Sequence, residues 1–149
     1  MNICKDNPYL ENILNIIFTW MEENSITSSV CYKCFGTAWS RSDFEDCFIN
    51  RTKSPTVSTT RKILAGLGYS FEFQSLNGKL EYDGNLRNFL KSVLLPYRPQ
   101  YLYEHDLLSR STYTYIMRKR NDNNELYISL EAFTYILYVL NIQLILKKV

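Results

Sequence analysis

One pattern of predicted helices and strands occurs twice in this chain of 149 residues, and this repeat constrains the fold more than any other feature. The tripeptide Ser-Arg-Ser opens a predicted helix at residues 40–42 and again at residues 109–111, which is 69 positions later. Thr56 and Ser129 lie 73 positions apart, and each precedes a segment with apolar residues at helical spacing. Both are residue types that cap helix N-termini. We therefore expect two units with the same order of elements.

A strand-like segment follows each of the two capped helices. Residues 71–73 (Phe-Glu-Phe) and 144–146 (Leu-Ile-Leu) correspond at the same offset of 73. The offset grows from 69 to 73 between the third and fourth helices, so the second unit has a four-residue insertion in its polar loop at residues 121–127. Few residues are identical between the units, so the repeat is one of pattern.

Hydrophobic spacing and turn residues assign the elements of each unit. In the first unit they predict helices at residues 8–23, 28–35, 40–50 and 57–66, then a strand at 70–74 that turns at Asn77-Gly78 into a second strand at 80–82. In the second unit they predict a helix from Leu86 that stops before Pro96, helices at 99–107 and 109–120, a helix capped by Ser129 that runs to Leu140, and a strand at 142–146.

The closing strands of the two units need partners, because an open strand edge exposes unpaired backbone groups. Ile142, Leu144, Ile145 and Leu146 are also too apolar to remain exposed to solvent. We expect the strand of one unit to pair with that of the other, which gives an intramolecular pseudo-dimer, or with that of a second subunit, which gives a homodimer.

Residues 102–112 (Leu-Tyr-Glu-His-Asp-Leu-Leu-Ser-Arg-Ser-Thr) resemble the second and third helices of an Xre, or lambda-repressor-like, helix-turn-helix domain. Leu107 stands where that family usually has glycine. Residues 54–68 are similar to the fourth helix of Xre-type antitoxins, whereas residues 30–35 match the second helix poorly. The resemblance implies a mainly α fold class, with two tandem helix-turn-helix units of about four helices each, each followed by a short strand or hairpin. The expected domains are residues 1–82 and 83–149.

In a helix-turn-helix domain the third helix lies in the major groove, and its first residues reach base edges. In the second unit the resemblance places Arg110, Ser111, Thr112 and Tyr115 at these positions. The basic residues Arg118, Lys119 and Arg120 end the same helix and are candidates for contacts with backbone phosphates. Tyr113 and Ile116 are expected on the buried side.

The third helix of the first unit has a different charge. Arg41 and Ser42 occupy its reading positions, but Asp43, Glu45 and Asp46 follow directly. Carboxylates repel a phosphate backbone, so we expect these three residues to form a protein-binding surface instead. Across the chain, residues 1–75 hold 7 basic and 8 acidic residues, whereas residues 76–149 hold 10 and 7. The charge balance therefore also favours nucleic-acid binding by the second unit.

These patterns predict a DNA-binding transcriptional regulator, a repressor or autoregulator of prokaryotic or phage origin. Two alternatives remain open: a phage inhibitor of a host nuclease, of the anti-CRISPR type, on the same scaffold, or an antitoxin. We expect no enzyme, because no nucleophile–base pair, glycine-rich phosphate loop or carboxylate pair is present.

The remaining residues with reactive side chains are better explained as structural. His105 is the only histidine and lies between two acidic residues, where a surface position is expected. Cys31 and Cys34 have metal-ligand spacing, but Cys4 and Cys47 are isolated, so buried thiols and no metal or other cofactor are expected. The chain has no run of 18 apolar residues and no signal pattern at its start, which predicts a cytoplasmic protein.

Overall fold

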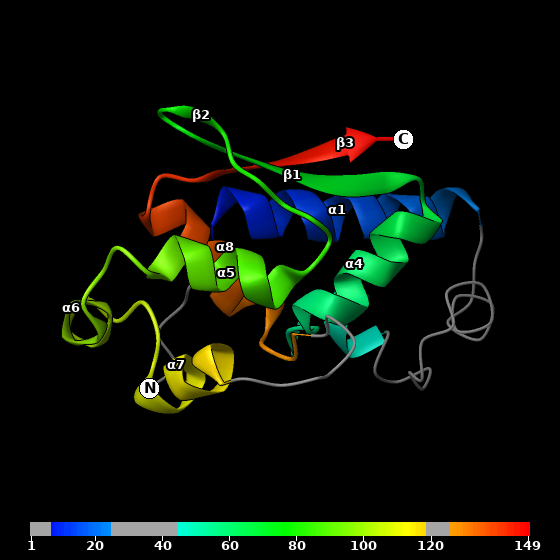
Figure 1. Ribbon diagram of the computed structural model, residues 1–149. Helices are drawn as coiled ribbons and strands as arrows, with labels where there is room; N and C mark the ends of the chain where they lie inside the picture. Colours follow the sequence, from blue (N-terminus) through cyan, green and yellow to red (C-terminus); the bar gives the residue numbers. More distant parts are fainter. Residues whose placement is uncertain (1–6, 25–44, 119–125) are drawn as a thin grey trace.

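The computed structural model describes residues 7–24, 45–118 and 126–149. These residues form a mainly helical fold with one small sheet (Figure 1). In chain order the elements are α1 (Pro8–Glu23), the π-helical turn η1 (Glu45–Ile49), α4 (Val57–Gly66), β1 (Tyr69–Ser75), β2 (Gly78–Lys79), α5 (Leu86–Leu94), α6 (Pro99–Glu104), α7 (Arg110–Met117), α8 (Leu130–Val139) and β3 (Gln143–Lys148).

The three strands form an antiparallel sheet in the order β2-β1-β3. Figure 1 shows the sheet on one side of the molecule, with α1, α4, α5 and α8 packed beneath it and with α6 and α7 farther away. Phe71 and Phe73 of β1 and Leu144 of β3 are buried, while Ser70, Glu72 and Gln143 are half-buried or exposed. This alternation gives the sheet one apolar face toward the helices and one polar face toward solvent.

The helix predicted at residues 8–23 is confirmed. Pro8 stands in its first turn, and the Asn7 side chain accepts a hydrogen bond from the Leu10 amide at 3.0 Å. The Asn7 amide group also donates to the Thr134 hydroxyl of α8 at 3.0 Å, in a buried contact. The N-terminal cap of α1 therefore also fixes this helix against the second unit.

The repeat is confirmed in its helix–strand part. Helices α4 and α8 both have ten residues, and the side chains of their N-caps, Thr56 and Ser129, both accept from the amide three residues later. Each helix is followed by a residue of left-handed backbone, Gly68 with φ +89° and Asn141 with φ +59°, again 73 positions apart. Glycine and asparagine are the residues that most readily adopt this conformation. The chain then enters β1 or β3.

The two copies meet in two antiparallel pairings. In the first, a bridge joins Thr56 to Ser129. The Val57 amide donates to the Ile128 carbonyl at 2.9 Å, and the Leu130 amide donates to the Pro55 carbonyl at 2.7 Å. Val57 and Leu130 are equivalent positions of the repeat, and so are Pro55 and Ile128, so each hydrogen bond is the counterpart of the other. A local twofold axis produces such a reciprocal pair.

The second pairing is that of β1 with β3. It runs from Tyr69 opposite Lys148 to Gln74 opposite Gln143, and it places Glu72 opposite Ile145. Glu72 and Ile145 are 73 positions apart, the same spacing as Thr56 and Ser129. Both pairings are therefore centred on equivalent residues, and the two helix–strand copies are related by one pseudo-twofold axis.

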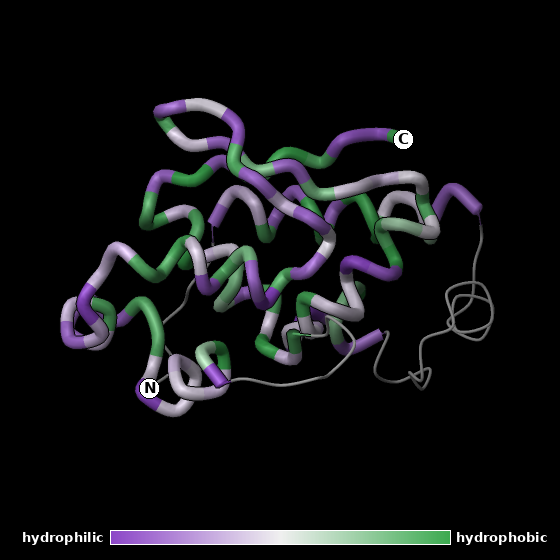
Figure 2. Tube along the Cα trace, viewed as in Figure 1, coloured by the Kyte–Doolittle hydropathy of each residue, from purple (hydrophilic) through white to green (hydrophobic). Residues whose placement is uncertain are grey.

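Phe73 lies at the centre of the core beneath the sheet. Its ring stacks on Phe89 of α5 with centroids 3.9 Å apart and contacts the rings of Tyr82 and Phe133 edge-on at 5.2 and 6.2 Å. The buried apolar residues of both predicted units belong to a single cluster. Figure 2 shows that apolar stretches alternate with polar ones along the chain. Among the described residues, no helix has both the length and the apolar character needed to cross a membrane.

Several predicted boundaries were wrong. The returning strand of the hairpin is only Gly78–Lys79. The Leu80 amide still donates to the Phe73 carbonyl at 2.9 Å, and Leu80 and Tyr82 then pack against the core. The helix predicted at 99–107 ends at Glu104, and the one predicted at 109–120 begins at Arg110, with Ser109 as its cap, and ends at Met117.

A helix-turn-helix unit in residues 1–82 is not shown by the described residues. The helix predicted at 28–35 and residues 40–44 of the next one lie outside them, and residues 45–49 of that helix form the π-helical turn η1.

The left-handed residue between α8 and β3 gives a test of the repeat. Asn141→Gly is expected to leave the free energy of unfolding nearly unchanged, whereas Asn141→Ala is expected to lower it by about 1 kcal/mol, because only alanine pays the steric cost of a positive φ. Urea unfolding followed by circular dichroism measures both. Equal stability of the two variants would show that residue 141 does not adopt this conformation.

Candidate nucleic-acid interface

A tight turn joins α6 to α7. The Asp106 amide donates to the Tyr103 carbonyl at 3.2 Å, and the Leu107 amide donates to the Leu102 carbonyl at 3.0 Å. This is the Schellman arrangement, and Asp106 supplies its left-handed residue with φ +54°. Leu102 and Leu107 are both buried, which adds the apolar contact typical of this motif. Leu107 therefore does not need the left-handed backbone conformation that glycine favours, because Asp106 adopts it instead.

Hydroxyl groups gather at the N-terminus of α7. The Ser109 Oγ accepts a hydrogen bond from the Thr112 amide at 3.2 Å and lies 2.9 Å from the Thr112 Oγ1 and 3.1 Å from the Ser111 Oγ. Ser109 and Ser111 are exposed and Thr112 is half-buried. The first turn of α7 thus presents hydroxyls and free backbone amides at the surface, which suits contacts with anionic oxygens.

Arg110 projects from the same turn. Its side chain is exposed, and its guanidinium carbon lies 4.9 Å from the centroid of the Tyr103 ring. Tyr103 is held in turn by an edge-on contact with Tyr113 at 5.9 Å. A cation–π contact of this kind restrains the arginine side chain, which stays exposed at the surface. Sequence reasoning missed Tyr103, which acts only through this spatial contact.

Tyr115 does not lie on this exposed surface. It is half-buried, its ring lies under the Arg87 guanidinium at 4.5 Å, and its hydroxyl accepts a hydrogen bond from the Tyr127 amide at 2.9 Å. Ile116, which the sequence placed on the buried side, is fully buried. The structure therefore gives Tyr115 contacts within the protein. These contacts disfavour a role of Tyr115 in reading DNA bases, and that role stays a prediction.

Arg87 of α5 anchors the other end of α7. It is only 5% exposed, and its Nη1 donates to the Ile116 carbonyl at 3.1 Å and to the Tyr115 carbonyl. Lys91, one turn later, donates to the Arg118 carbonyl at 3.4 Å. Two cations thus bind the carbonyl end of α7, where the helix dipole favours positive charge. Sequence reasoning missed this contact.

The position of Arg87 in its helix carried a signal for this role. It precedes Leu90 by three residues and Leu94 by seven, and both leucines are fully buried. These spacings place the arginine on the buried face of α5.

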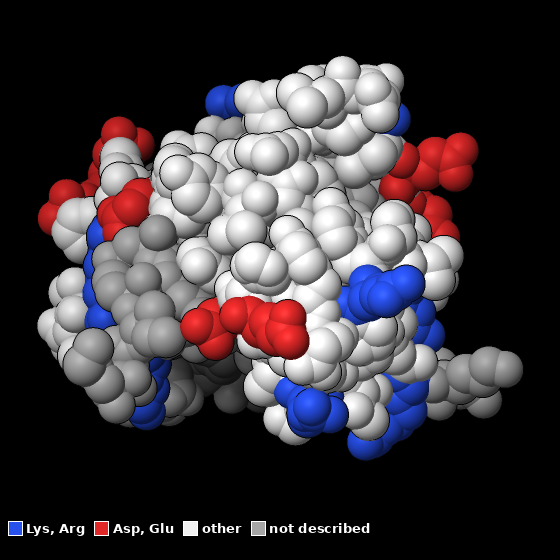
Figure 3. Space-filling view, turned by 90° about the vertical axis from the view of Figure 1, so that its left-hand side faces the viewer, with Lys and Arg blue, Asp and Glu red and all other residues white. Residues whose placement is uncertain are grey.

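The surface around α6 and α7 carries both signs of charge. Figure 3 views the side on which these helices lie in Figure 1 and shows an acidic patch with basic patches beside and below it. Glu104 and Asp106 are exposed near Arg110, and Arg118 is exposed at the end of α7. Lys119 and Arg120 lie outside the described residues. In the described part of this surface, the α7 segment contributes two exposed cations, Arg110 and Arg118, and Arg98 before α6 contributes a third.

The acidic residues of the first unit are largely engaged. Asp46 forms an ion pair with Lys53 at 3.7 Å, and its carbonyl accepts hydrogen bonds from the amides of Thr52 and Lys53. Glu45 and Asp46 are both half-buried in η1. The other predicted residues of this segment, Arg41, Ser42 and Asp43, lie outside the described residues. The described part of the segment does not form a free acidic surface.

No metal centre is formed by the residues that the structure describes, which contain no group of three His, Cys, Asp or Glu side chains placed to hold an ion. Cys47 is buried, and Cys4, Cys31 and Cys34 lie outside the described residues. His105 is exposed and its ring lies 4.2 Å from that of Tyr101.

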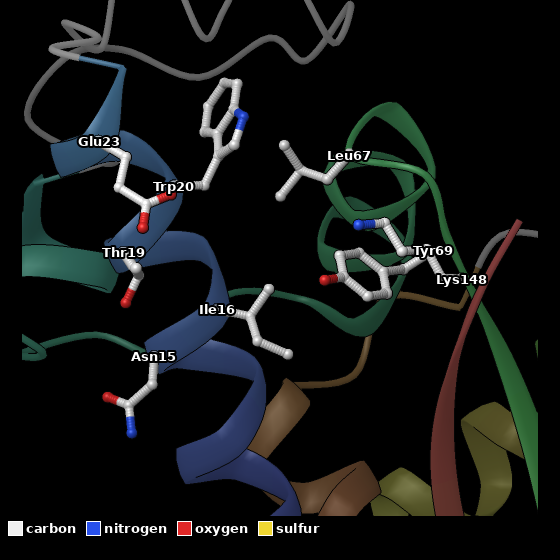
Figure 4. A pocket seen from close by; sticks show the side chains of 8 residues that line it. All are labelled: Asn15, Ile16, Thr19, Trp20, Glu23, Leu67, Tyr69 and Lys148. Atoms are coloured by element: carbon white, nitrogen blue, oxygen red, sulfur yellow. The ribbon is translucent and has the colours of Figure 1, made fainter.

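A separate cleft of about 380 Å³ lies between α1 and the start of β1. Figure 4 shows Ile16 and Trp20 of α1 facing Leu67, Tyr69 and Lys148 across it. The Lys148 ammonium lies 6.0 Å from the centroid of the Tyr69 ring. The cleft contains none of the residues that the sequence selected, and it is formed by elements other than α6 and α7.

Replacing Arg87 tests whether it anchors α7. Arg87→Met is expected to lower the free energy of unfolding by about 2 kcal/mol, because two buried carbonyls lose a charged donor. Hydrogen exchange of the α7 amides is expected to accelerate. Arg98→Met is the matched control, since Arg98 is exposed and its side chain makes no capping hydrogen bond. Unchanged exchange in α7 of Arg87→Met would contradict the anchoring role.

No protein-family model, curated protein or solved structure matches the chain. The proposed function therefore rests on the geometry of α6 and α7. The resemblance of residues 102–112 to the Xre family remains a prediction from the sequence.

Proposed function

We propose that the protein binds duplex DNA through α6, its turn and α7, acting as a helix-turn-helix transcriptional regulator. The observation that carries this proposal is the asymmetry of α7. Its N-terminal turn is exposed with Arg110, while its C-terminal carbonyls are fixed to α5 by Arg87 and Lys91. A reading helix needs such an arrangement, with one end free for the groove and the other held by the scaffold.

Each exposed group has a distinct role in this proposal. The Arg110 guanidinium pairs with guanine through two parallel hydrogen bonds. Ser111 and Thr112 donate their hydroxyls to phosphates at the helix N-terminus, and Arg118 binds a backbone phosphate. Lys119 and Arg120 continue the basic segment in the sequence and add phosphate contacts.

The first unit has a subordinate role. Figure 1 shows η1 (cyan) and α7 (yellow) on the side of the molecule away from the sheet. Arg41 and Ser42 precede η1 in the sequence and lie outside the described residues, so a second DNA contact from them stays a prediction. Asp46 is neutralised by Lys53 and does not repel the phosphates strongly.

The alternatives, a nuclease inhibitor that presents an acidic surface or an antitoxin, gain no support from the described residues. The Asp46–Lys53 ion pair removes part of the charge that a DNA-mimicking surface needs.

Replacing Arg110 tests the reading helix. Binding to a duplex pool enriched from random sequences by selection with the unmodified protein, followed by fluorescence anisotropy, is expected to weaken roughly tenfold in Arg110→Ala, the loss of one good base contact. Lys147→Ala is the control, because this exposed lysine lies on β3 in the sheet on the other side of the molecule. Equal weakening in both variants would indicate attraction to overall charge and would reject α7 as the reading helix.

Arg118 is expected to act through phosphate alone. Arg118→Ala is expected to weaken binding to all sequences similarly and to lower the slope of log affinity against log salt by about 1. Titrations of the same duplex pool at several salt concentrations measure this slope. An unchanged slope would remove Arg118 from the interface.

A further inference from the structure

Two leucines project into solvent where the β1–β2 hairpin and the end of α5 come together. Leu76 at the hairpin turn is 93% exposed, and Leu95, directly after α5, is 79% exposed. Tyr138 and Val139, at the end of α8, are also exposed. Single exposed apolar residues are common, but several together on one end of a small protein indicate an interaction surface.

A groove of about 390 Å³ lies between the hairpin, α5 and the residues that follow α8. Its apolar lining includes Leu80, Phe89, Val93, Tyr97, Leu140 and Ile142. Glu81 is the one charged side chain that lines it. The groove is large enough to accept an apolar side chain from another molecule.

Exposed charged residues at this end of the molecule include Lys79, Glu81 and Arg98, in the segments that border the groove. Figure 3 shows an expanse without charged side chains between the charges at the top of the view and the acidic and basic patches below. A nucleic acid would need positive charge on its binding surface, so this uncharged expanse does not fit one. We call it the leucine face, defined by Leu76, Leu95 and the groove.

We propose that a second copy of this chain covers the leucine face and that the protein is a homodimer through it. A twofold contact requires one patch that is complementary to itself. The leucine face meets this requirement because it has both projecting leucines and an apolar groove. In the dimer, Leu76 or Leu95 of each subunit enters the groove of the other.

The location of this interface has a consequence for the rest of the molecule. Leu95 is followed by α6 after only three residues, so dimerisation through the leucine face brings the α6–α7 segments of the two subunits to either side of one interface. The dimer would then present two copies of α7. Dimerisation itself does not depend on DNA binding and is measured without DNA.

Sedimentation velocity over a range of protein concentrations tests the proposal. The unmodified protein is expected to sediment as a dimer that dissociates on dilution. Leu76→Asp and Leu95→Asp are each expected to raise the dimer dissociation constant roughly tenfold or more, because each removes an apolar contact and introduces a buried charge.

Val149→Asp is the matched control. Val149 is also 93% exposed, but it follows β3 at the opposite end of the sheet. The dimer dissociation constant of the Val149→Asp variant is therefore expected to be unchanged. Since Leu76 and Leu95 are exposed in the monomer, their variants should retain the circular dichroism spectrum. A monomer at the highest concentration reached would overturn the proposal, as would a dimer that Leu76→Asp and Leu95→Asp leave intact.

Discussion

The antiparallel pairing of β1 with β3 is the interaction on which the rest of this structure depends. It joins the strand that closes the first copy of the repeat to the strand that closes the second, and it is reinforced by the reciprocal hydrogen bonds around Thr56 and Ser129. Both contacts are centred on residues 73 positions apart. The two halves are thereby fixed about one axis, and each strand satisfies backbone groups that would otherwise be exposed.

This pairing positions α7 through a short series of contacts. The sheet holds Phe73 over the core, Phe73 stacks on Phe89, and Phe89 fixes one face of α5. Another face of α5 carries Arg87 and Lys91, which bind the carbonyl end of α7. The exposed turn around Arg110 is thus connected to the most buried part of the molecule. In the proposed function, a loss of packing beneath the sheet would also displace the DNA-binding helix.

The parts of the fold that follow from local rules were predictable from the sequence. Pro8, Thr56 and Ser129 mark helix starts whatever surrounds them, and the offset of 73 that aligned the two units is the one on which β1 and β3 pair. Contacts set by the tertiary fold were not predictable. The spacing of Arg87 from Leu90 and Leu94 places it on the buried face of α5, but its hydrogen-bond partners, the carbonyls at the end of α7, come from the tertiary fold. The contacts of Tyr115 were not predictable for the same reason, because its partners are Arg87 of α5 and the Tyr127 amide before α8.

In the proposed function, α7 and the turn before it form the DNA-binding surface of this pseudo-twofold molecule. Nuclear magnetic resonance of the ¹⁵N-labelled protein, titrated with a DNA duplex, tests it most directly. We expect chemical-shift changes in the amides of residues 105–118, centred on Ser109 to Thr112, and none in β1 or β3. Changes concentrated in the sheet, or no change at any DNA concentration, would contradict it.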